Sequence, residues 1–417
     1  MTLLISGGTL IDGTGRPPVK DGAVLIEGER VVAAGARSSF AAPESAELVD
    51  VAGGYILPGL IDTHVHLTAE EFRLDRRAAT PFSLNFYQTI DRMRRTLEAG
   101  ITTVRDAGGA DLGLKLAVEQ GLVAGPRMQI SISALTITGG HGDGWTPSGM
   151  ETGLFATYPG RPDGRCDGVE QVRAKVREVL RAGAEVIKVH ATGGVLSPTD
   201  NPRFTQFSLA ELEVMVAEGA DRGGVKVMAH AQGAAGVKRA LRAGIHSIEH
   251  GIYLDQEAIE LFLERGAFLV PTLLAPVSVL EQADAHPGAL PEWGVRKARE
   301  VIQVHKESVA EAVRAGVKVA MGTDAGVMPH GQNLRELELM RQVGMEPMQV
   351  LVATTAVAAG CLGWQDRVGT LEPGKLADAV VLRKDPLADL AALADPAEVR
   401  WVLKGGRWVK ADGKMLV

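Results

Sequence analysis

The sequence predicts an α/β fold, a (β/α)₈ TIM barrel with a small β-sandwich domain formed by the N- and C-terminal segments. Two observations lead to this fold class. Through the middle of the chain, short apolar runs alternate with longer segments of helical periodicity, which is typical of parallel βαβ units. At both ends, apolar and polar residues alternate between Gly and Pro turns, which is typical of short strands.

The β-rich ends comprise residues 1–56 and 366–417. The first contains the strand-like stretches LLISGGTLID, AVLIEGERVVAAG and AELVDVAGGYILPG, and the second contains GTLEPGKLADAVVL and VRWVLKGGRWV. We expect these two segments to fold together as a β-sandwich beside a barrel that spans about residues 57–365.

Eight apolar runs between the two ends are the predicted barrel strands, and eight strand–helix units in succession favour a barrel over an open sheet. Helical stretches at 169–184 and 208–224 are among the segments that separate them. Several runs end in His, Asp or Lys, which places ligand-type side chains where barrel enzymes build their active sites. The runs lie at residues 60–67, 101–106, 128–133, 186–191, 225–230, 246–250, 267–272 and 317–324.

Length, charge and composition exclude several classes of protein. The 417 residues are enough for one large barrel and a smaller attached unit, and the net charge of −7 argues against a nucleic-acid partner. The N-terminus lacks the basic region of a signal peptide, and no charge-free apolar run reaches the roughly 18 residues that span a bilayer. Cys166 and Cys361 are too few for a disulfide framework or a thiolate metal site. We therefore expect a cytoplasmic protein with no membrane partner.

His64 and His66 lie two residues apart at the end of the first predicted strand. Side chains alternate along a strand, so both imidazoles point to one face, here the barrel interior. Two converging imidazoles can bind one divalent cation, although a pair of hydrogen-bonded core histidines has the same spacing. The H-x-H motif alone leaves both interpretations open.

His230 and His250 end the fifth and sixth predicted strands, and Asp324 ends the eighth. Each alone is a weak indication, because a strand-end His is usually structural and an Asp before Ala-Gly often lies in a turn. Together with the H-x-H motif they put four imidazoles and a carboxylate on one rim, which suits Zn²⁺ or a similar metal. Asp324 could also act as general base toward metal-bound water.

Lys188 is expected to point inward from the fourth predicted strand, between apolar neighbours. A buried ammonium is costly unless it is paired or neutralised. The side chain therefore pairs with an acid, reaches solvent, or is carboxylated by CO₂ to a carbamate whose two oxygens bridge two metals. His190, on the same face, is a second candidate ligand, and we rank it as a residue that supports the ligands.

Taken together, these motifs resemble the amidohydrolase superfamily. PGLIDTHVHL is similar to its first-strand signature, IKVHATGG to its lysine strand, and MAHAQG and SIEHG to its two histidine strands. GTDAG is similar to its terminal aspartate motif and GTLEPGKLADAVVL to its C-terminal β-unit. The resemblance covers essentially the whole chain. In detail it points to the imidazolonepropionase-related, prolidase-like branch, which contains peptidases of the Xaa-Pro dipeptidase kind and N-acyl amino-acid hydrolases.

This resemblance implies a binuclear metal centre. Its implied ligands are His64, His66, Lys188, His230, His250 and Asp324. The first two histidines and the aspartate would hold the more buried cation, the later two histidines the second, and Lys188, as N6-carboxylysine, would bridge them. A hydroxide between the metals would attack the amide carbonyl, and Asp324 would pass the water proton to the leaving amine. The expected cofactors are two divalent ions, with Zn²⁺ the expected metal, and CO₂ for Lys188.

Two further histidines are candidate substrate-binding residues. His141 lies in the Gly-rich stretch GGHGDGW, where relatives use a His to polarise the substrate carbonyl, so the resemblance implies a catalytic, oxyanion-stabilising role. A flexible surface turn is the alternative, and Asp143 either orients the imidazole or forms an Asx turn. His330 is expected at the mouth of the cavity. In the same stretch, Asn333 and Glu336 could instead form an N-cap and a capping box.

The expected reaction is hydrolysis of a small amide, either a dipeptide of the Xaa-Pro type or an N-acyl amino acid. Some prolidase-like relatives place a Tyr directly after the fifth-strand His, where its hydroxyl binds the terminal carboxylate of the substrate. Here that position is Ala231, followed by Gln232. The side-chain preference, the physiological metal and the oligomeric state stay open, although relatives often form homo-oligomers.

Hydrolysis of a cyclic amide, of the imidazolone or hydantoin type, is the second choice. A deaminase is less favoured, because single-metal deaminases usually lack the strand-four lysine and carry a Glu shortly after the fifth-strand His. The Gly-rich opening GGTLIDGTG is followed by RPPVKDG and not by a helix, which excludes a dinucleotide-binding fold. A catalytically inactive barrel is disfavoured, since all six ligand positions are filled.

Overall fold

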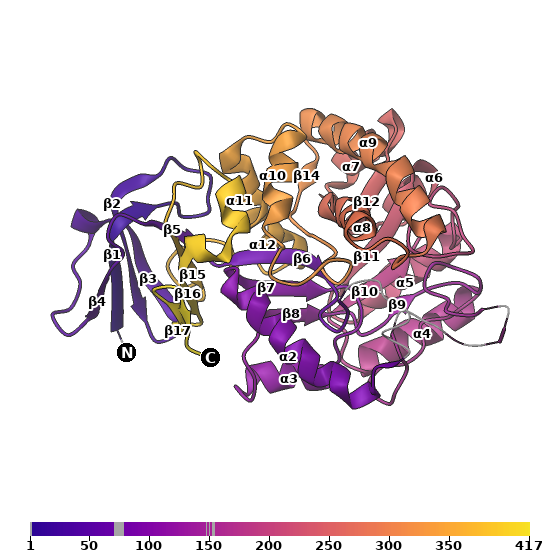
Figure 1. Cartoon of the computed structure of the whole chain (residues 1–417), viewed down its shortest axis with the longest axis horizontal. Coiled ribbons are helices and arrows are strands. Elements are labelled where there is room, and N and C mark those ends of the chain that lie inside the picture. The colour runs from indigo at the N-terminus through magenta and orange to yellow at the C-terminus, as the bar shows by residue number, and fades with distance from the viewer. Residues whose placement is uncertain (1, 71–78, 147, 150, 152–154) are drawn as a thin grey trace.

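The computed structural model describes residues 2–70, 79–146, 148–149, 151 and 155–417. The chain forms a TIM barrel with a β-rich unit beside it (Figure 1), as the sequence predicts. In the β-rich unit, segments from the two ends of the chain lie side by side, indigo and yellow in Figure 1. No helix among these residues is long and apolar enough to cross a membrane.

The barrel strands are parallel and run in chain order around the barrel. They pair in two arcs, β6-β7-β8 and β9-β10-β11-β12-β13-β14. Backbone hydrogen bonds from the segment after β14 to β6 bring the last strand against the first, including those from Thr63 N to Met321 O and from His66 N to Ala325 O. The strands are β6 (Leu60–Val65), β7 (Ile101–Asp106), β8 (Arg127–Ile130), β9 (Ala134–Leu135), β10 (Val186–His190), β11 (Lys226–Gly233), β12 (Ser247–Tyr253), β13 (Phe268–Val270) and β14 (Lys318–Val319).

The third predicted strand, at 128–133, is interrupted in the structure. β8 (Arg127–Ile130) covers only its first half and β9 (Ala134–Leu135) begins after its end, and Ile132 between the two strands has a φ of 66°. A β-branched residue in the left-handed region cannot continue a ladder, so the chain changes direction there. The apolar pattern of the run persists through the break, which is why the sequence shows one strand.

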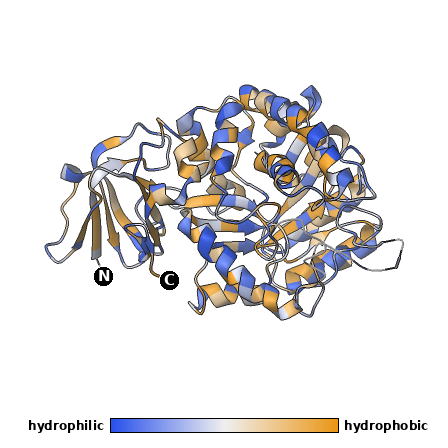
Figure 2. Ribbon diagram, in the orientation of Figure 1, coloured by the Kyte–Doolittle hydropathy of each residue, from blue (hydrophilic) through white to orange (hydrophobic). Residues whose placement is uncertain are grey.

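Helices surround the barrel strands, and hydrophobic and hydrophilic residues alternate along many of them (Figure 2). In α4 the buried residues Val172, Val176 and Val179 recur at the spacing of one helix face. Ser208 and Glu211 form a capping box that starts α5. The helices are α2 (Phe82–Glu98), α3 (Leu112–Glu119), α4 (Val169–Arg181), α5 (Leu209–Asp221), α6 (Ala234–Arg242), α7 (Gln256–Arg265), α8 (Leu274–Ala285), α9 (Glu292–Ala315), α10 (Arg335–Gln342), α11 (Pro347–Ala353) and α12 (Ala356–Leu362).

The two ends of the chain share one sheet. Within the described residues it has nine strands in the order β18-β17-β16-β15-β5-β1-β2-β3, with β4 paired to β1. The antiparallel pair β5–β15 is the joint between the N-terminal and C-terminal contributions. The domain limits at 56 and 366 stay predictions. The strands are β1 (Thr2–Leu10), β2 (Val19–Glu27), β3 (Arg30–Ala36), β4 (Glu47–Asp50), β5 (Tyr55–Pro58), β15 (Ala379–Leu382), β16 (Val399–Lys404), β17 (Arg407–Ala411) and β18 (Lys414–Met415).

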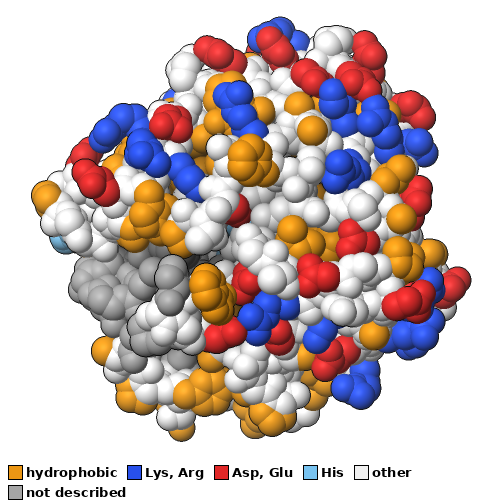
Figure 3. Space-filling view, turned by 90° about the vertical axis from the view of Figure 1, so that its right-hand side faces the viewer, with side chains coloured by type: hydrophobic (Ala, Val, Ile, Leu, Met, Phe, Trp, Pro, Cys, Tyr) orange, Lys and Arg blue, Asp and Glu red, His pale blue; other side chains and the backbone are white. Residues whose placement is uncertain are grey.

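On the face of the barrel seen in Figure 3, acidic and basic side chains are interspersed. This face carries no broad patch of one sign. A nucleic acid needs a stripe of positive charge along which its phosphates can lie. The distribution on this face therefore offers no such footprint.

Replacing Ile56 by Ala tests the joint between the two ends. Ile56 is fully buried and lies opposite Val381 across the β5–β15 pair. We expect Ile56→Ala to lower the free energy of unfolding by about 2–5 kcal/mol, because the cavity is lined from both chain ends. Denaturant titration checks this, with Leu48→Ala as control, since Leu48 is 63% exposed. Equal losses in the two variants would contradict the assignment of this core.

Candidate metal centre

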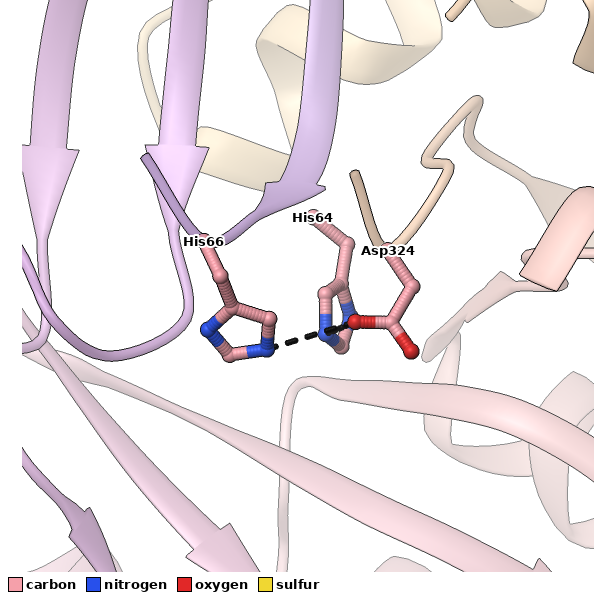
Figure 4. A group of neighbouring side chains, drawn as sticks. All are labelled: His64, His66 and Asp324. Atoms are coloured by element: carbon pink, nitrogen blue, oxygen red, sulfur yellow. Dashed lines mark ion pairs between the residues drawn. The ribbon is translucent and has the colours of Figure 1, made fainter. Parts of the chain in front are cut away.

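His64, His66 and Asp324 converge at the carboxyl ends of β6 and β14 (Figure 4). Asp324 Oδ1 lies 3.5 Å from His64 Nε2 and 3.3 Å from His66 Nε2. One ligand atom from each side chain lies within 4.8 Å of the others, which is the separation that a shared cation requires. The structure therefore brings together three of the predicted ligands, from positions about 260 residues apart.

Hydrogen bonds behind the imidazoles determine which ring nitrogen faces this cluster. His64 Nδ1 donates to Glu249 Oε2 at 2.7 Å, because a carboxylate can only accept. His66 Nδ1 donates to the carbonyl oxygen of Gly108 at 2.8 Å. In both rings the Nε2 lone pair is left directed toward Asp324, which is the arrangement of a metal-binding histidine.

His230, His250 and Lys188 lie on the adjacent strands. The ring centroids of His230 and His250 are 4.5 Å apart, and those of His250 and His64 are 5.3 Å apart. His230 Nε2 lies 3.0 Å from the carbonyl oxygen of Gly193 and His250 Nδ1 lies 2.7 Å from Thr272 Oγ1, so each ring keeps one nitrogen for a ligand. Lys188 is buried and lines the same cavity as the two histidines.

Burial sets the charge of these groups. It lowers the pKa of His64 to about 4 and the pKa of His250 well below its ordinary value, so both imidazoles are neutral at pH 7. Burial also lowers the pKa of Lys188 to about 8, which makes the uncharged amine accessible. Burial alone would raise the pKa of Asp324, but the imidazoles of His66, His64 and His250 around it lower it. Neutral imidazoles and an ionised carboxylate are the forms that bind metal.

Two of the clustered residues have left-handed backbones. The φ of His250 is 76° and that of Asp324 is 61°. For residues other than Gly this conformation costs about 1–3 kcal/mol and persists where the surroundings enforce it, often at functional sites. Here it turns the two side chains into the mouth of the barrel at the point where each strand ends.

One cavity of about 1250 Å³ collects these side chains. Its floor is formed by the predicted ligands, and aromatic residues including Phe155 and Tyr158 form part of its wall. Arg161 lies over both of these rings, 5.1 and 5.3 Å from their centroids. All six predicted ligands line the cavity, together with His141: His64, His66, Lys188, His230, His250 and Asp324.

The profile of the Amidohydrolase family matches residues 55–409. The chain belongs to the amidohydrolase family. It is 34% identical over 429 residues to ochratoxinase of Aspergillus niger, covering 98% of this chain and 87% of ochratoxinase. It is 28% identical over 405 residues to imidazolonepropionase of Hyphomonas neptunium, covering 89% and 90% of the two chains. A crystal structure of a prolidase complexed with N-methylphosphonate-L-proline is 37% identical, with a TM-score of 0.90 and coverage of 99% and 100%. The protein is thus a hydrolase that acts on amide bonds.

In this amidohydrolase, His141 reaches the cavity from the segment after β9. Its ring stacks on His230, with centroids 4.3 Å apart, and its Nδ1 lies 2.8 Å from Ser197 Oγ. Asp143 does not orient the ring. Its Oδ1 accepts the backbone N–H of Trp145, which is the Asx turn that the sequence left as the alternative.

His330 has a different position from the one expected at the cavity mouth. It is buried, and its Nε2 lies 3.2 Å from His66 O and 3.0 Å from Ala69 O. His330 is not one of the described residues that line the cavity. Its contacts fix the backbone that carries His66, and the predicted role in substrate binding stays a prediction.

The capping box considered for Asn333 and Glu336 is wrong. The helix α10 begins at Arg335 with no side-chain cap, and the two oxygens of Glu336 accept the backbone N–H groups of Leu273 and Leu274. Asn333 Nδ2 instead donates to Asp62 at 2.8 Å. Both side chains therefore tie barrel segments together.

His190 lies beside the cluster, and its role as a residue that supports the ligands stays a prediction. Its ring meets that of His141 edge-on, with centroids 5.0 Å apart, and its Nδ1 is buried without a hydrogen-bond partner. A Cβ at Gly142 would come within 2.8 Å of this nitrogen, so a glycine is required there.

Three charged residues near the ligands were missed in the sequence. Glu249 accepts hydrogen bonds from His64 and, at 3.0 Å, from Arg105. Asp62 Oδ1 accepts the backbone N–H of His64 at 3.0 Å and that of Thr323 at 3.2 Å. The available signal was their position: charged residues inside otherwise apolar strands, each within two residues of a histidine or an aspartate.

Glu249→Gln tests the support of His64. We expect the affinity for a divalent metal to fall about 10- to 100-fold, as is typical when the partner of a metal-binding His is removed. Competition against a chromophoric chelator measures this affinity. The matched control is Glu213→Gln, which changes an exposed carboxylate on α5. An unchanged affinity in Glu249→Gln would contradict the role given to Glu249.

Proposed function

We propose that this amidohydrolase cleaves the amide bond of a dipeptide, of the Xaa-Pro kind, or of an N-acyl amino acid at a centre of two divalent cations. The observation that carries the proposal is the convergence of His64, His66 and Asp324 in a cavity that Lys188 also lines. Zn²⁺ is the metal we expect, because imidazole and carboxylate donors suit it.

The donor set fits two cations. His64, His66 and Asp324 would hold the first, His230 and His250 the second, and carboxylated Lys188 would bridge them. The fit rests on burial and on protonation. Burial lowers the pKa of His230 and of His250 well below the ordinary value, and it lowers the pKa of Lys188 to about 8, toward the reactive, uncharged amine. When bound, such cations polarise a carbonyl and lower the pKa of water.

The residues of the chain then position and move protons. Asp324 Oδ1 is held between two imidazoles and is ionised, so it is placed to accept a proton from water and to deliver it to the leaving amine. His141 presents its Nε2 side to the cavity, since Ser197 binds its Nδ1. From there it would donate to the carbonyl oxygen as negative charge develops on it.

Binding of a substrate carboxylate needs a donor other than the Tyr of some relatives. Ala231 is fully buried, and the next residue, Gln232, lines the cavity. A side-chain amide can donate through its NH₂ group, so Gln232 is a candidate for this contact. The complex of the similar prolidase with a proline phosphonate supports a substrate of dipeptide size.

Hydrolysis of a cyclic amide is the second candidate function. The similarity to imidazolonepropionase favours it. The same donors and the same proton transfer at Asp324 would serve a ring amide, and only the walls of the cavity would have to differ.

Amine release from a library of dipeptides and N-acyl amino acids tests the proposed function. We expect turnover of a subset, and its complete loss when a chelator removes the metal. Restoring Zn²⁺ should restore the rate. If the metal-loaded protein opens cyclic amides and leaves every linear amide intact, the second candidate replaces the first.

Lys188→Ala tests the bridging carbamate. We expect the variant to lose bound metal and its rate to fall by more than about 100-fold. Removing the hydrogen-bond partner of a ligand already costs about 10- to 100-fold in metal affinity or activity, and removing the ligand itself should cost more. Short-chain carboxylic acids, which mimic the carbamate, should restore part of both. Metal content by mass spectrometry is the direct measurement, with Lys226→Ala, at the exposed start of β11, as control. Full metal content and rate in Lys188→Ala would exclude the bridge.

A further inference from the structure

The ring of His141 occupies a slot that the segment after β10 completes. On one side it stacks on His230 at an interplanar angle of 27°. It also lies against Gly194, where an added Cβ would overlap the ring. The slot therefore confines the plane of the imidazole, and a side chain at position 194 would overlap the ring.

A chain of hydrogen bonds fixes the ring within this slot. The hydroxyl of Ser197 donates its only proton to Asp200, so the Ser197 oxygen accepts from His141 Nδ1. Asp200 Oδ2 lies 3.5 Å from the same nitrogen. Asp200 is itself held by the backbone N–H of Gly194 and by the side chain of Gln206. His141 Nε2 is thereby left as the ring nitrogen that faces the cavity.

Lys297, on α9, anchors this segment from behind. Its Nζ donates to the carbonyl oxygens of Gly194 at 3.0 Å, Ser197 at 2.8 Å and Asp200 at 2.7 Å. These three bonds use all three N–H groups of the ammonium. The Lys297 side chain is 12% exposed, and Lys297 is not one of the described residues that line the cavity. One cation from a distant helix thus holds the three residues that surround the His141 ring.

We propose that Lys297 is a positioning residue for catalysis, which acts by holding the 194–200 segment so that His141 meets the substrate carbonyl. The proposal rests on the proposed function, in which His141 stabilises the developing negative charge. Such stabilisation requires a preorganised donor, and a misplacement of about 1 Å can cost 100-fold in rate. Lys297 does not itself line the cavity. It acts through the segment that it holds, in which Ser197 bonds His141.

Kinetics in two backgrounds test this dependence. With any amide that the protein hydrolyses, Lys297→Met should lower kcat about 10- to 100-fold and leave KM nearly unchanged. In a His141→Ala background the same substitution should have no further effect, because the group that it positions is gone. The control is Lys306→Met, which removes another lysine of α9. Equal losses in both backgrounds would overturn the proposal.

A measurement without substrate separates this proposal from the proposed function. In protein labelled with ¹⁵N-histidine, the His141 signals are those that disappear in His141→Ala. Lys297→Met and Ser197→Ala should both shift them, and Lys306→Met should not. Unchanged His141 signals in Lys297→Met would overturn the positioning role even if no amide is hydrolysed. Lys297→Gln, which keeps donors for the carbonyls, replaces Lys297→Met if that variant does not fold, with a smaller shift expected.

Discussion

The site depends on the seam where the end of β14 meets β6. The backbone N–H of Asp324 donates to the carbonyl of His64 at 2.8 Å, and the buried Asp62 accepts from the backbone of both His64 and Thr323. Asn333 adds a fourth donor to the same carboxylate, beside the Thr323 hydroxyl. One buried carboxylate therefore fixes the first and last strands to each other. The separation of the imidazoles from Asp324 follows from backbone hydrogen bonds as well as from side-chain rotamers.

A second buried charge explains the tautomer of His64. Glu249 is fully buried and is paired with Arg105, at 3.0 Å, and with His64. A buried ion pair contributes little net stability, because desolvation offsets much of its attraction. An apolar pair of the same volume would serve the core equally well. The pair is better explained by what it does to His64, whose Nδ1 proton it holds so that Nε2 stays free.

Much of the fold was predictable, and so was the convergence of His64, His66 and Asp324. Both follow from local rules, because apolar periodicity marks strands and strand ends carry function. The contact between Glu249 and His64 was not predictable, because strict alternation places Glu249 on the opposite face of β12 from His250. The φ of 76° at His250 breaks that alternation, so both side chains reach the interior. The slot around His141 could not be predicted from the sequence either, because Lys297 lies more than 150 residues away from His141 in the chain. Positive φ values and contacts between distant segments leave no periodic signal.

The division of the cavity between strand ends and connecting segments also affects which substrate can bind. The predicted ligands lie at strand ends, whereas the cavity walls, including Trp145, Phe155 and Arg161, come from the segments between strands. Relatives named for different activities, an ochratoxinase and an imidazolonepropionase, match most of this chain. We therefore expect the side chains of the walls, rather than the predicted ligands, to set the preference for one amide over another. The Lys297 anchor holds one such wall segment and orients His141 at the same time. Any change of substrate that remodels the 194–200 segment must therefore keep Gly194 and the three carbonyls in place, or lose the group that His141 supplies.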